Sequence, residues 1–180
     1  MTKDSSETKQ KLLKAATQVV REKGASSLTL DAVAKQAGVS KGGLLYHYPN
    51  KTALLAAMVT HLNDSFERAI AEQIANGMTS WLAAYVAMSF DPQQSQTAES
   101  AGMLAAVAND MNLLEPLRQR YKILQQQLEA SSSDPDFATI VRLAADGLWF
   151  AELFGISGLT EERRSQVLAR LITLTKEQND

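Results

Sequence analysis

The sequence contains no cysteine, only two histidines and no long apolar run. The absence of cysteine excludes disulfides, a thiolate nucleophile and any zinc site with sulfur ligands. The first ten residues lack the apolar stretch of a signal peptide, and no run reaches the roughly eighteen apolar residues of a membrane span. We therefore expect a cytoplasmic protein without a metal, a cofactor or a membrane partner.

Charge is distributed unevenly along the 180 residues, although the net charge is only −2. Residues 1–51 hold nine Lys or Arg and four acidic residues, whereas the remainder holds nine basic and 16 acidic residues. A basic N-terminal segment followed by an acidic remainder is typical of a protein in which only one part contacts phosphate. A solvated basic surface with no nucleic-acid partner explains the charge equally well.

Apolar residues recur at helical spacing in nearly every segment, and no segment shows sustained alternation of apolar and polar residues. We therefore predict an all-α fold with an N-terminal three-helix domain over 1–50 and a larger helical domain over 51–180. With 45% hydrophobic residues, the chain can bury a substantial core. The expected helices, about nine, lie near 7–23, 30–37, 41–46, 51–75, 78–89, 97–109, 113–130, 135–153 and 160–177.

The segment TLDAVAKQAGVSKGGLLYHYPNK, Thr29 to Lys51, has the pattern of a helix-turn-helix. Thr29 and Ser40 are suited to cap two short helices, and Gly38 is suited to the turn between them. In such a unit the second helix enters the major groove of DNA. Gly42 and Gly43 weaken that helix, by roughly 1 kcal/mol each in a helix interior, but allow its backbone to approach DNA closely.

Two lysines follow the expected helix caps Ser40 and Asn50. Lys41 and Lys51 are both placed in a first turn, where a cation opposes the helix dipole. The free backbone N–H groups at such helix ends bind phosphate well, so the lysines make sense if DNA supplies the missing anion. Exposed lysines at helix starts are also common and harmless.

Three aromatic residues, Tyr46, His47 and Tyr48, follow at the end of the second short helix. A phenol or imidazole can donate a hydrogen bond to phosphate, and its ring can pack on sugar or a thymine methyl. We expect Tyr48 to close the core of the small domain instead.

The run GVSKGGLLYHYPNKTALLAAM, with the two helices before it, resembles the tetracycline-repressor (TetR) family of bacterial regulators over about residues 7–60. The resemblance implies an N-terminal DNA-binding domain and a larger domain for ligand binding and dimerisation. By position, it implies phosphate contacts from Thr29, Tyr46, His47 and Lys51. It places Ser40, Lys41, Gly42, Gly43 and Leu44 toward the groove. Leu45 departs from the family pattern, since many relatives have an aromatic residue there. We expect this difference to alter which bases the protein prefers.

The C-terminal two-thirds carry no motif of comparable strength. As a hypothesis, some of Trp81, Tyr85, Met88, Met103 and Trp149 line a cavity for a small-molecule inducer. Ordinary bundle core is the better interpretation for any one of them. One face of the helix expected over 135–153 carries the small residues Ala144, Gly147 and Ala151, together with Leu148 and Glu152. Small side chains at this spacing allow another helix to approach closely. The last helix carries Val167, Leu168, Leu171 and Leu174.

We expect the last two helices of each subunit to form a homodimer, as the resemblance implies, although the final stripe can equally pack within one chain. The predicted function is a ligand-responsive transcriptional regulator that binds an inverted-repeat operator in double-stranded DNA. The resemblance implies that it represses transcription, as is usual in the family. An unknown small-molecule inducer is expected to release it from the operator. A ligand-binding adaptor of the same fold without specific DNA binding is the alternative. An enzyme ranks last, because we find no serine-histidine-carboxylate pattern, Gly-rich phosphate loop or metal-ligand spacing.

Overall fold

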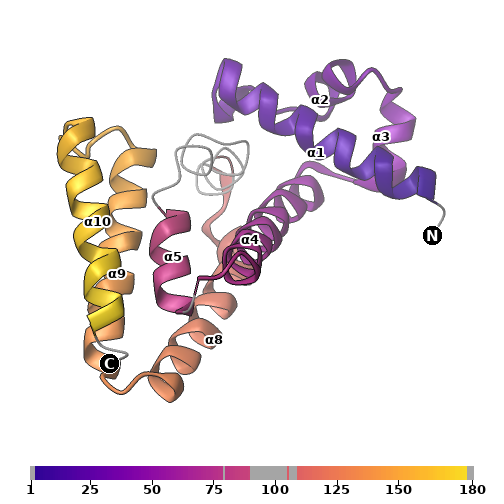
Figure 1. Cartoon of the computed structure of the whole chain (residues 1–180). Helices are drawn as coiled ribbons and strands as arrows, with labels where there is room; N and C mark the ends of the chain where they lie inside the picture. The colour runs from indigo at the N-terminus through magenta and orange to yellow at the C-terminus, as the bar shows by residue number, and fades with distance from the viewer. Residues whose placement is uncertain (1–2, 79, 90–104, 106–108, 178–180) are drawn as a thin grey trace. The chain divides into compact units, whose positions relative to one another are not determined.

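The computed structural model describes residues 3–78, 80–89, 105 and 109–177 (Figure 1). Within these ranges the chain is helical and has no strand, which confirms the predicted all-α class. The α-helices are α1 (Lys3–Lys23), α2 (Leu30–Ala37), α3 (Lys41–His47), α4 (Lys51–Ala75), α5 (Trp81–Ser89), α8 (Glu115–Ser131), α9 (Pro135–Leu153) and α10 (Glu161–Glu177). Two short 3₁₀ helices cover Ala25–Ser27 and Met111–Leu114. Most of the helix expected over 97–109 lies outside the described residues.

The helix starts follow the predicted capping residues closely. Thr29, Ser40 and Asn50 each accept a hydrogen bond from the backbone N–H three residues later, at 3.1, 3.0 and 2.8 Å. Asp134 caps α9 in the same way, with Pro135 in the first turn. These side chains satisfy backbone donors that have no partner within the helix, so each fixes where its helix begins.

The chain forms two compact units. The first comprises the described residues within 1–63 and 97–118, and the second those within 64–96 and 119–180. One boundary between the units falls within α4, after residue 63, and another within α8, after residue 118. Each of these helices therefore contributes residues to both units. None of the described helices combines the length and apolar character needed to span a membrane. The predicted boundary at residue 50 separates a DNA-binding domain from a ligand-binding and dimerisation domain. This assignment of functions stays a prediction.

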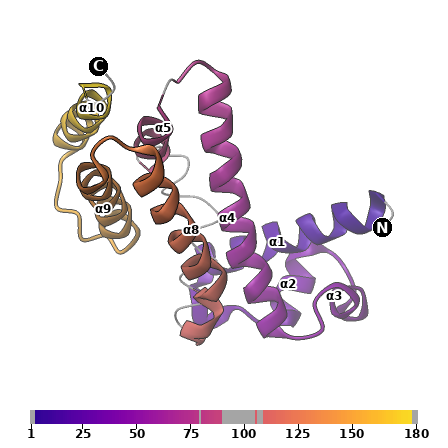
Figure 2. The ribbon, with the colours of Figure 1, turned by 90° about the horizontal axis from the view of Figure 1, so that it is seen from below.

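The core of the first unit gathers the apolar faces of α1, α2, α3 and the first half of α4 (Figure 2). Its members are almost completely removed from solvent, and α4 contributes as strongly as α1 does. They include Leu12, Ala16, Val19, Val33, Leu44, Tyr48, Leu54, Leu55, Met58 and Val59. This core holds α2 and α3 in fixed mutual positions, which a DNA-binding surface needs.

The second unit packs α5 against α9 and α10, which lie side by side in Figure 1. Its core is formed by apolar residues of α4, α5, α8 and α9, with the last helix packed against it. The buried members are Ile70, Ala84, Tyr85, Val86, Met88, Leu124, Leu128, Ala138, Val141 and Ala145.

Candidate nucleic-acid interface

The helix-turn-helix predicted over Thr29–Lys51 is present as α2, a turn and α3. Gly38 ends α2 with φ of 63°, a left-handed conformation that glycine adopts without the steric cost of a Cβ. On α3 and at its cap, most of the predicted groove-facing residues are exposed to solvent: Ser40, Lys41, Gly42 and Gly43, together with Leu45 and Tyr46. These side chains and glycine backbones form one exposed surface, which we call the α3 surface.

Leu44 does not belong to the α3 surface. Its side chain is 0% exposed and packs in the core of the first unit, so the expectation that it faces the groove is wrong. Leu44 lies four residues before the buried Tyr48, whose backbone N–H donates to the Leu44 carbonyl at 2.8 Å. Residues four apart share a helix face, so Leu44 is on the core side, and Leu45, 36% exposed, takes the outward position.

Ser40 and Gly43 form the start of α3 together. The Ser40 hydroxyl oxygen accepts from the Gly43 N–H at 3.0 Å, and its own proton remains available to donate. A Cβ built on Gly43 would lie 3.3 Å from that oxygen, whereas a Cβ on Gly42 would lie 4.0 Å away. A Cβ at Gly43 would therefore be tight against the cap, while a Cβ at Gly42 would make only an ordinary van der Waals contact with it.

The aromatic residues after this turn separate into exposed and buried members. Tyr46 is 82% exposed, and its ring meets the half-buried His47 edge-on with centroids 5.0 Å apart. Tyr48 is buried, as predicted, and its burial raises its pKa from the ordinary 10.0. Tyr46 and His47 therefore keep polar atoms near solvent, while Tyr48 is part of the core.

The two first-turn lysines differ in their surroundings. The Lys41 ammonium lies 3.0 Å and 3.1 Å from the two carboxylate oxygens of Asp31 on α2. Lys41 was expected to pair with a DNA phosphate, but it already has an anionic partner within the chain, the Asp31 carboxylate. The sequence interpretation missed this pair. No ion-pair partner for Lys51 is found among the residues that the structure describes. Thr29, like Lys41, is exposed, and Lys51 is half-buried.

The structure brings three of the predicted ligand-pocket residues together in the second unit. Tyr85 and Met88 are buried, and the half-buried Trp81 stacks on Tyr85 with ring centroids 5.2 Å apart. Trp149 contacts the neighbouring Phe150 and is not a member of this cluster. Met103 lies outside the described residues. A role in ligand binding stays a prediction for all five.

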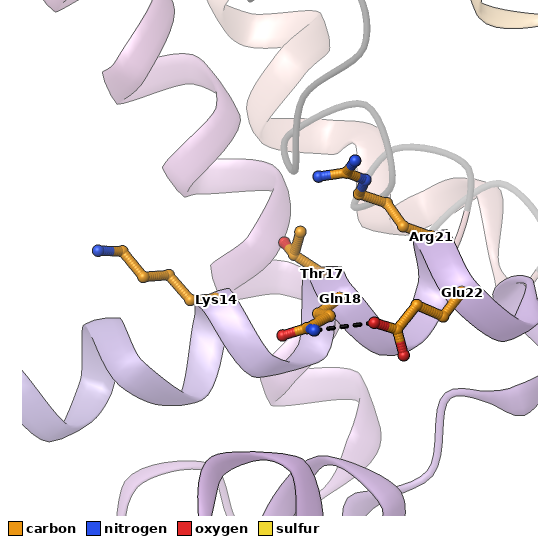
Figure 3. A pocket seen from close by; sticks show the side chains of 5 residues that line it. All are labelled: Lys14, Thr17, Gln18, Arg21 and Glu22. Carbon is orange, nitrogen blue, oxygen red and sulfur yellow. Dashed lines mark hydrogen bonds between the residues drawn. The ribbon is translucent and has the colours of Figure 1, made fainter.

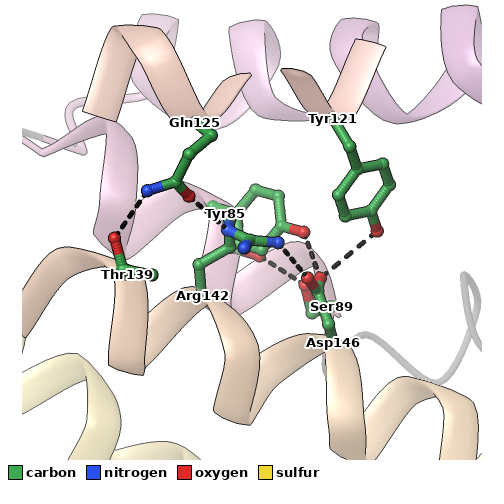
Figure 4. A network of polar contacts seen from close by, with 7 residues as sticks. All are labelled: Tyr85, Ser89, Tyr121, Gln125, Thr139, Arg142 and Asp146. Atoms are coloured by element: carbon green, nitrogen blue, oxygen red, sulfur yellow. Dashed lines mark hydrogen bonds and ion pairs between the residues drawn. The ribbon is translucent and has the colours of Figure 1, made fainter. Parts of the chain in front are cut away.

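A polar network lies beside these aromatic residues, and sequence reasoning did not find it (Figure 4). The carboxylate of Asp146 accepts from the hydroxyl of Tyr85, from that of Tyr121 at 3.3 Å, and from the Arg142 guanidinium at 2.7 Å. Gln125 in turn accepts from Arg142 at 3.1 Å. The network thereby joins α5, α8 and α9 through one carboxylate. The local signal was an Arg and an Asp four residues apart on a largely apolar helix.

Burial governs the ionisation of this network. It raises the pKa of Asp146 from the ordinary 3.8, while the Tyr85 hydroxyl and the Arg142 guanidinium lower it. Burial also raises the pKa of Tyr121 to about 12 and that of Tyr85 above its ordinary value. Both phenols therefore stay protonated near neutral pH and can donate to the carboxylate.

The last two helices present an apolar surface different from the predicted one. Val167, Leu168 and Leu171 pack against the core of their own unit, as the alternative interpretation expected. Glu152 pairs with Arg164 at 2.5 Å within the chain. The exposed apolar residues of α9 and of its C-cap, Phe154, instead follow one another at spacings of three and four, with the exposed Gly147 among them: Ile140, Leu143, Phe150 and Phe154.

A hollow of about 390 Å³ lies along α1 in the first unit (Figure 3). Its described lining is polar, and the Gln18 amide within it donates to Glu22 at 2.8 Å. It is lined by Lys14, Thr17, Gln18, Arg21 and Glu22. This hollow contains none of the residues predicted to bind a ligand.

Comparisons with known proteins agree with these features over most of the chain. The family of bacterial regulatory proteins of the tetR type matches residues 12–58, and the tetracyclin repressor-like C-terminal domain matches residues 79–176. The second match alone covers more than half of the chain. The chain therefore belongs to the TetR family of transcriptional regulators, which are DNA-binding proteins and not enzymes.

Two regulators and one solved structure illustrate the similarity. SrpR of Pseudomonas putida is 31% identical over 99 residues, which are 53% of this chain and 46% of SrpR. BetI of Serratia proteamaculans is 28% identical over 149 residues, 78% of this chain and 74% of BetI. The chain thus spans about half the length of the first relative. The multidrug binding protein EbrR complexed with malachite green has the same fold, with a TM-score of 0.64, 24% identity and coverage of 91% of this chain and 96% of EbrR.

Proposed function

We propose that this chain is a repressor that binds an inverted-repeat operator as a homodimer in the cytoplasm and is released by a small-molecule inducer. The observation that carries the proposal is the α3 surface, in which two glycines and a lysine are exposed at the capped start of a recognition helix. In a helix-turn-helix, residues at this end of the second helix contact base edges. Ser40, Lys41, Gly42 and Gly43 would contact the groove.

Phosphate contacts complete the proposed interface. Tyr46 lies on the α3 surface, and the other proposed contacts are Thr29, His47 and Lys51. Each of the four is exposed or half-buried and carries a hydrogen-bond donor. Lys51 is the strongest of these, because it sits in the first turn of α4 without an ion-pair partner among the described residues. Phosphate would occupy the positive end of that helix.

Selection of binding sites from a random duplex pool, followed by affinity measurements against salt, tests this proposal. We expect an enriched inverted repeat. Lys51→Ala should weaken binding to every sequence and reduce the salt slope by about 1.8, since one phosphate contact is lost from each subunit of the proposed dimer. Lys122→Ala, an exposed lysine on α8, is the matched control and should change neither. Weak binding without an enriched sequence would contradict the proposal and favour a ligand-binding adaptor.

The inducer is proposed to bind in the second unit, near Trp81, Tyr85 and Met88. The complex of EbrR with malachite green supports an aromatic organic molecule as the ligand. The stacked rings of Trp81 and Tyr85 suit such a ligand. Binding is expected to favour a conformation of the dimer that docks poorly on the operator. Organic dyes can be screened by the fluorescence of the two tryptophans, Trp81 and Trp149, beginning with malachite green. A ligand that saturates the protein yet leaves operator affinity unchanged would contradict this coupling.

A further inference from the structure

We propose that Asp31 limits non-specific binding to DNA by holding Lys41 in an ion pair across the helix-turn-helix. The inference rests on the proposed DNA-binding function and assigns a specificity role to a residue outside the predicted contact set. Asp31 lies in the first turn of α2, and Lys41 is the first residue of α3. The pair therefore connects the bracing helix to the start of the recognition helix.

The geometry of the pair is well defined. The Lys41 ammonium lies within hydrogen-bond distance of both oxygens of Asp31, at 3.0 and 3.1 Å. Both side chains remain open to solvent, with 58% of the Lys41 side chain and 71% of the Asp31 side chain exposed. An ammonium held in this way is accessible to a phosphate, but the phosphate has to compete with a carboxylate already in place.

The other lysines near this surface are not held. Among the described residues, Lys35 at the end of α2 and Lys51 at the start of α4 have no acidic group within ion-pair distance. Free lysines near a phosphate backbone contribute to binding of any sequence, because each one neutralises a phosphate and releases counterions. A restrained Lys41 contributes less to such binding.

The pair contributes little to the stability of the fold. Exposed ion pairs between flexible side chains add almost nothing in water, because solvent screens them and ordering the side chains costs entropy. The main effect of Asp31 is therefore expected in DNA binding. On the operator, the remaining contacts seat α3 in the groove and make up for the competition, whereas on a random duplex they do not.

The test compares Asp31→Asn with the wild-type chain on the selected operator and on a random duplex, at several salt concentrations. We expect Asp31→Asn to bind the random duplex about two- to fivefold more tightly, as loss of an exposed ion pair allows. Operator affinity should rise less, so the ratio between the two should fall. Thermal unfolding measures whether the variant remains folded at the assay temperature.

Two controls separate the ion pair from a general change in charge. Glu22→Gln removes one negative charge from the same unit at a residue that contacts Gln18 and not Lys41, and should leave the ratio unchanged. In a Lys41→Ala background, Asp31→Asn should have no effect, because there is no ammonium to release. An equal gain in that background, or no change in the ratio for Asp31→Asn alone, would overturn the inference. Absence of an operator for the wild-type chain would instead contradict the proposed function itself.

Discussion

Gly42 and Gly43 are neighbours in the first turn of α3 but constrain the helix differently. A Cβ on Gly43 would crowd the capping oxygen of Ser40 at 3.3 Å, whereas a Cβ on Gly42 has no neighbour closer than 4.0 Å. Packing within the chain therefore makes a Cβ at 43 tight but gives no reason for a glycine at 42. We propose that the close approach of DNA accounts for the glycine at 42.

Gly42→Ala separates stability from binding. Alanine has the higher helix propensity, so we expect the free energy of unfolding to rise by about 0.5 kcal/mol, less than in a helix interior. Operator affinity should fall, because the added methyl group lies where the DNA surface approaches. Urea unfolding and operator titration measure the two effects. Gly43→Ala should gain less stability because its Cβ presses on the Ser40 cap. If Gly42→Ala binds operator as tightly as the wild type, backbone approach at this position is excluded.

Helix α9 buries one ion pair among its apolar core residues and exposes further apolar residues on its other side. The buried side holds Arg142 and Asp146, whose side chains are 12% and 11% exposed. A buried ion pair contributes little net stability compared with apolar residues, but removal of one partner leaves an uncompensated charge. The pair therefore makes α9 sensitive to single substitutions at either position.

Arg142→Met is expected to lower the free energy of unfolding at pH 7 by about 3 kcal/mol. Burial already raises the pKa of Asp146, and loss of the guanidinium raises it further. A carboxyl with a raised folded-state pKa favours folding at low pH and loses that contribution as the pH rises through the folded value. The loss in Arg142→Met should therefore shrink as the pH is lowered from 7 toward 4, as urea unfolding at several pH values would show.

The double variant Arg142→Met, Asp146→Asn is the control for this prediction. It keeps an acceptor for the Tyr85 and Tyr121 hydroxyls but has no buried charge, so it should recover most of the stability at pH 7. An Arg142→Met loss that did not depend on pH would show that the guanidinium acts by packing on the Tyr121 ring, which lies 5.7 Å away, and not by its charge.

Sequence reasoning succeeded where interactions are local. Thr29, Ser40 and Asn50 bond to backbone groups three residues away, so the starts of α2, α3 and α4 could be predicted from the residues alone. The wrong orientation of Leu44 has a related cause. Its four-residue spacing from Tyr48, which was correctly assigned to the core, already indicated the buried face.

Contacts between distant segments could not be predicted in the same way. Asp31 and Lys41 are ten residues apart, and Tyr85 and Asp146 are 61 residues apart. Their meeting depends on how separate helices pack, which periodicity does not specify. The sequence thus predicted the type of site and most of its exposed residues, but not the internal anion beside Lys41 or the network around Asp146.

The exposed apolar residues of α9 lead to a prediction about assembly. Leu143 is 54% exposed in a row with Ile140, Phe150 and Phe154, and such a row is unfavourable in water unless another surface covers it. We expect Leu143→Glu to convert the proposed dimer into a monomer and to lower operator affinity more than tenfold, because one half-site alone binds weakly.

Sedimentation equilibrium and operator titration measure these two effects. Ile123→Glu on α8, where the original side chain is 56% exposed, is the matched control and should leave both unchanged. If Leu143→Glu remains a dimer, the subunits associate through a different surface.

The continuity of α4 has a consequence for exchanging DNA-reading heads between regulators. Leu54, Leu55, Met58 and Val59 of this helix belong to the core around α1, α2 and α3. A graft that ended at residue 50 would leave those four side chains behind and give the transplanted head an open apolar face. A functional chimaera therefore has to carry α4 to at least residue 63, together with the part of the first unit that lies within 97–118. The recipient has to accept one seam within α4 and another within α8.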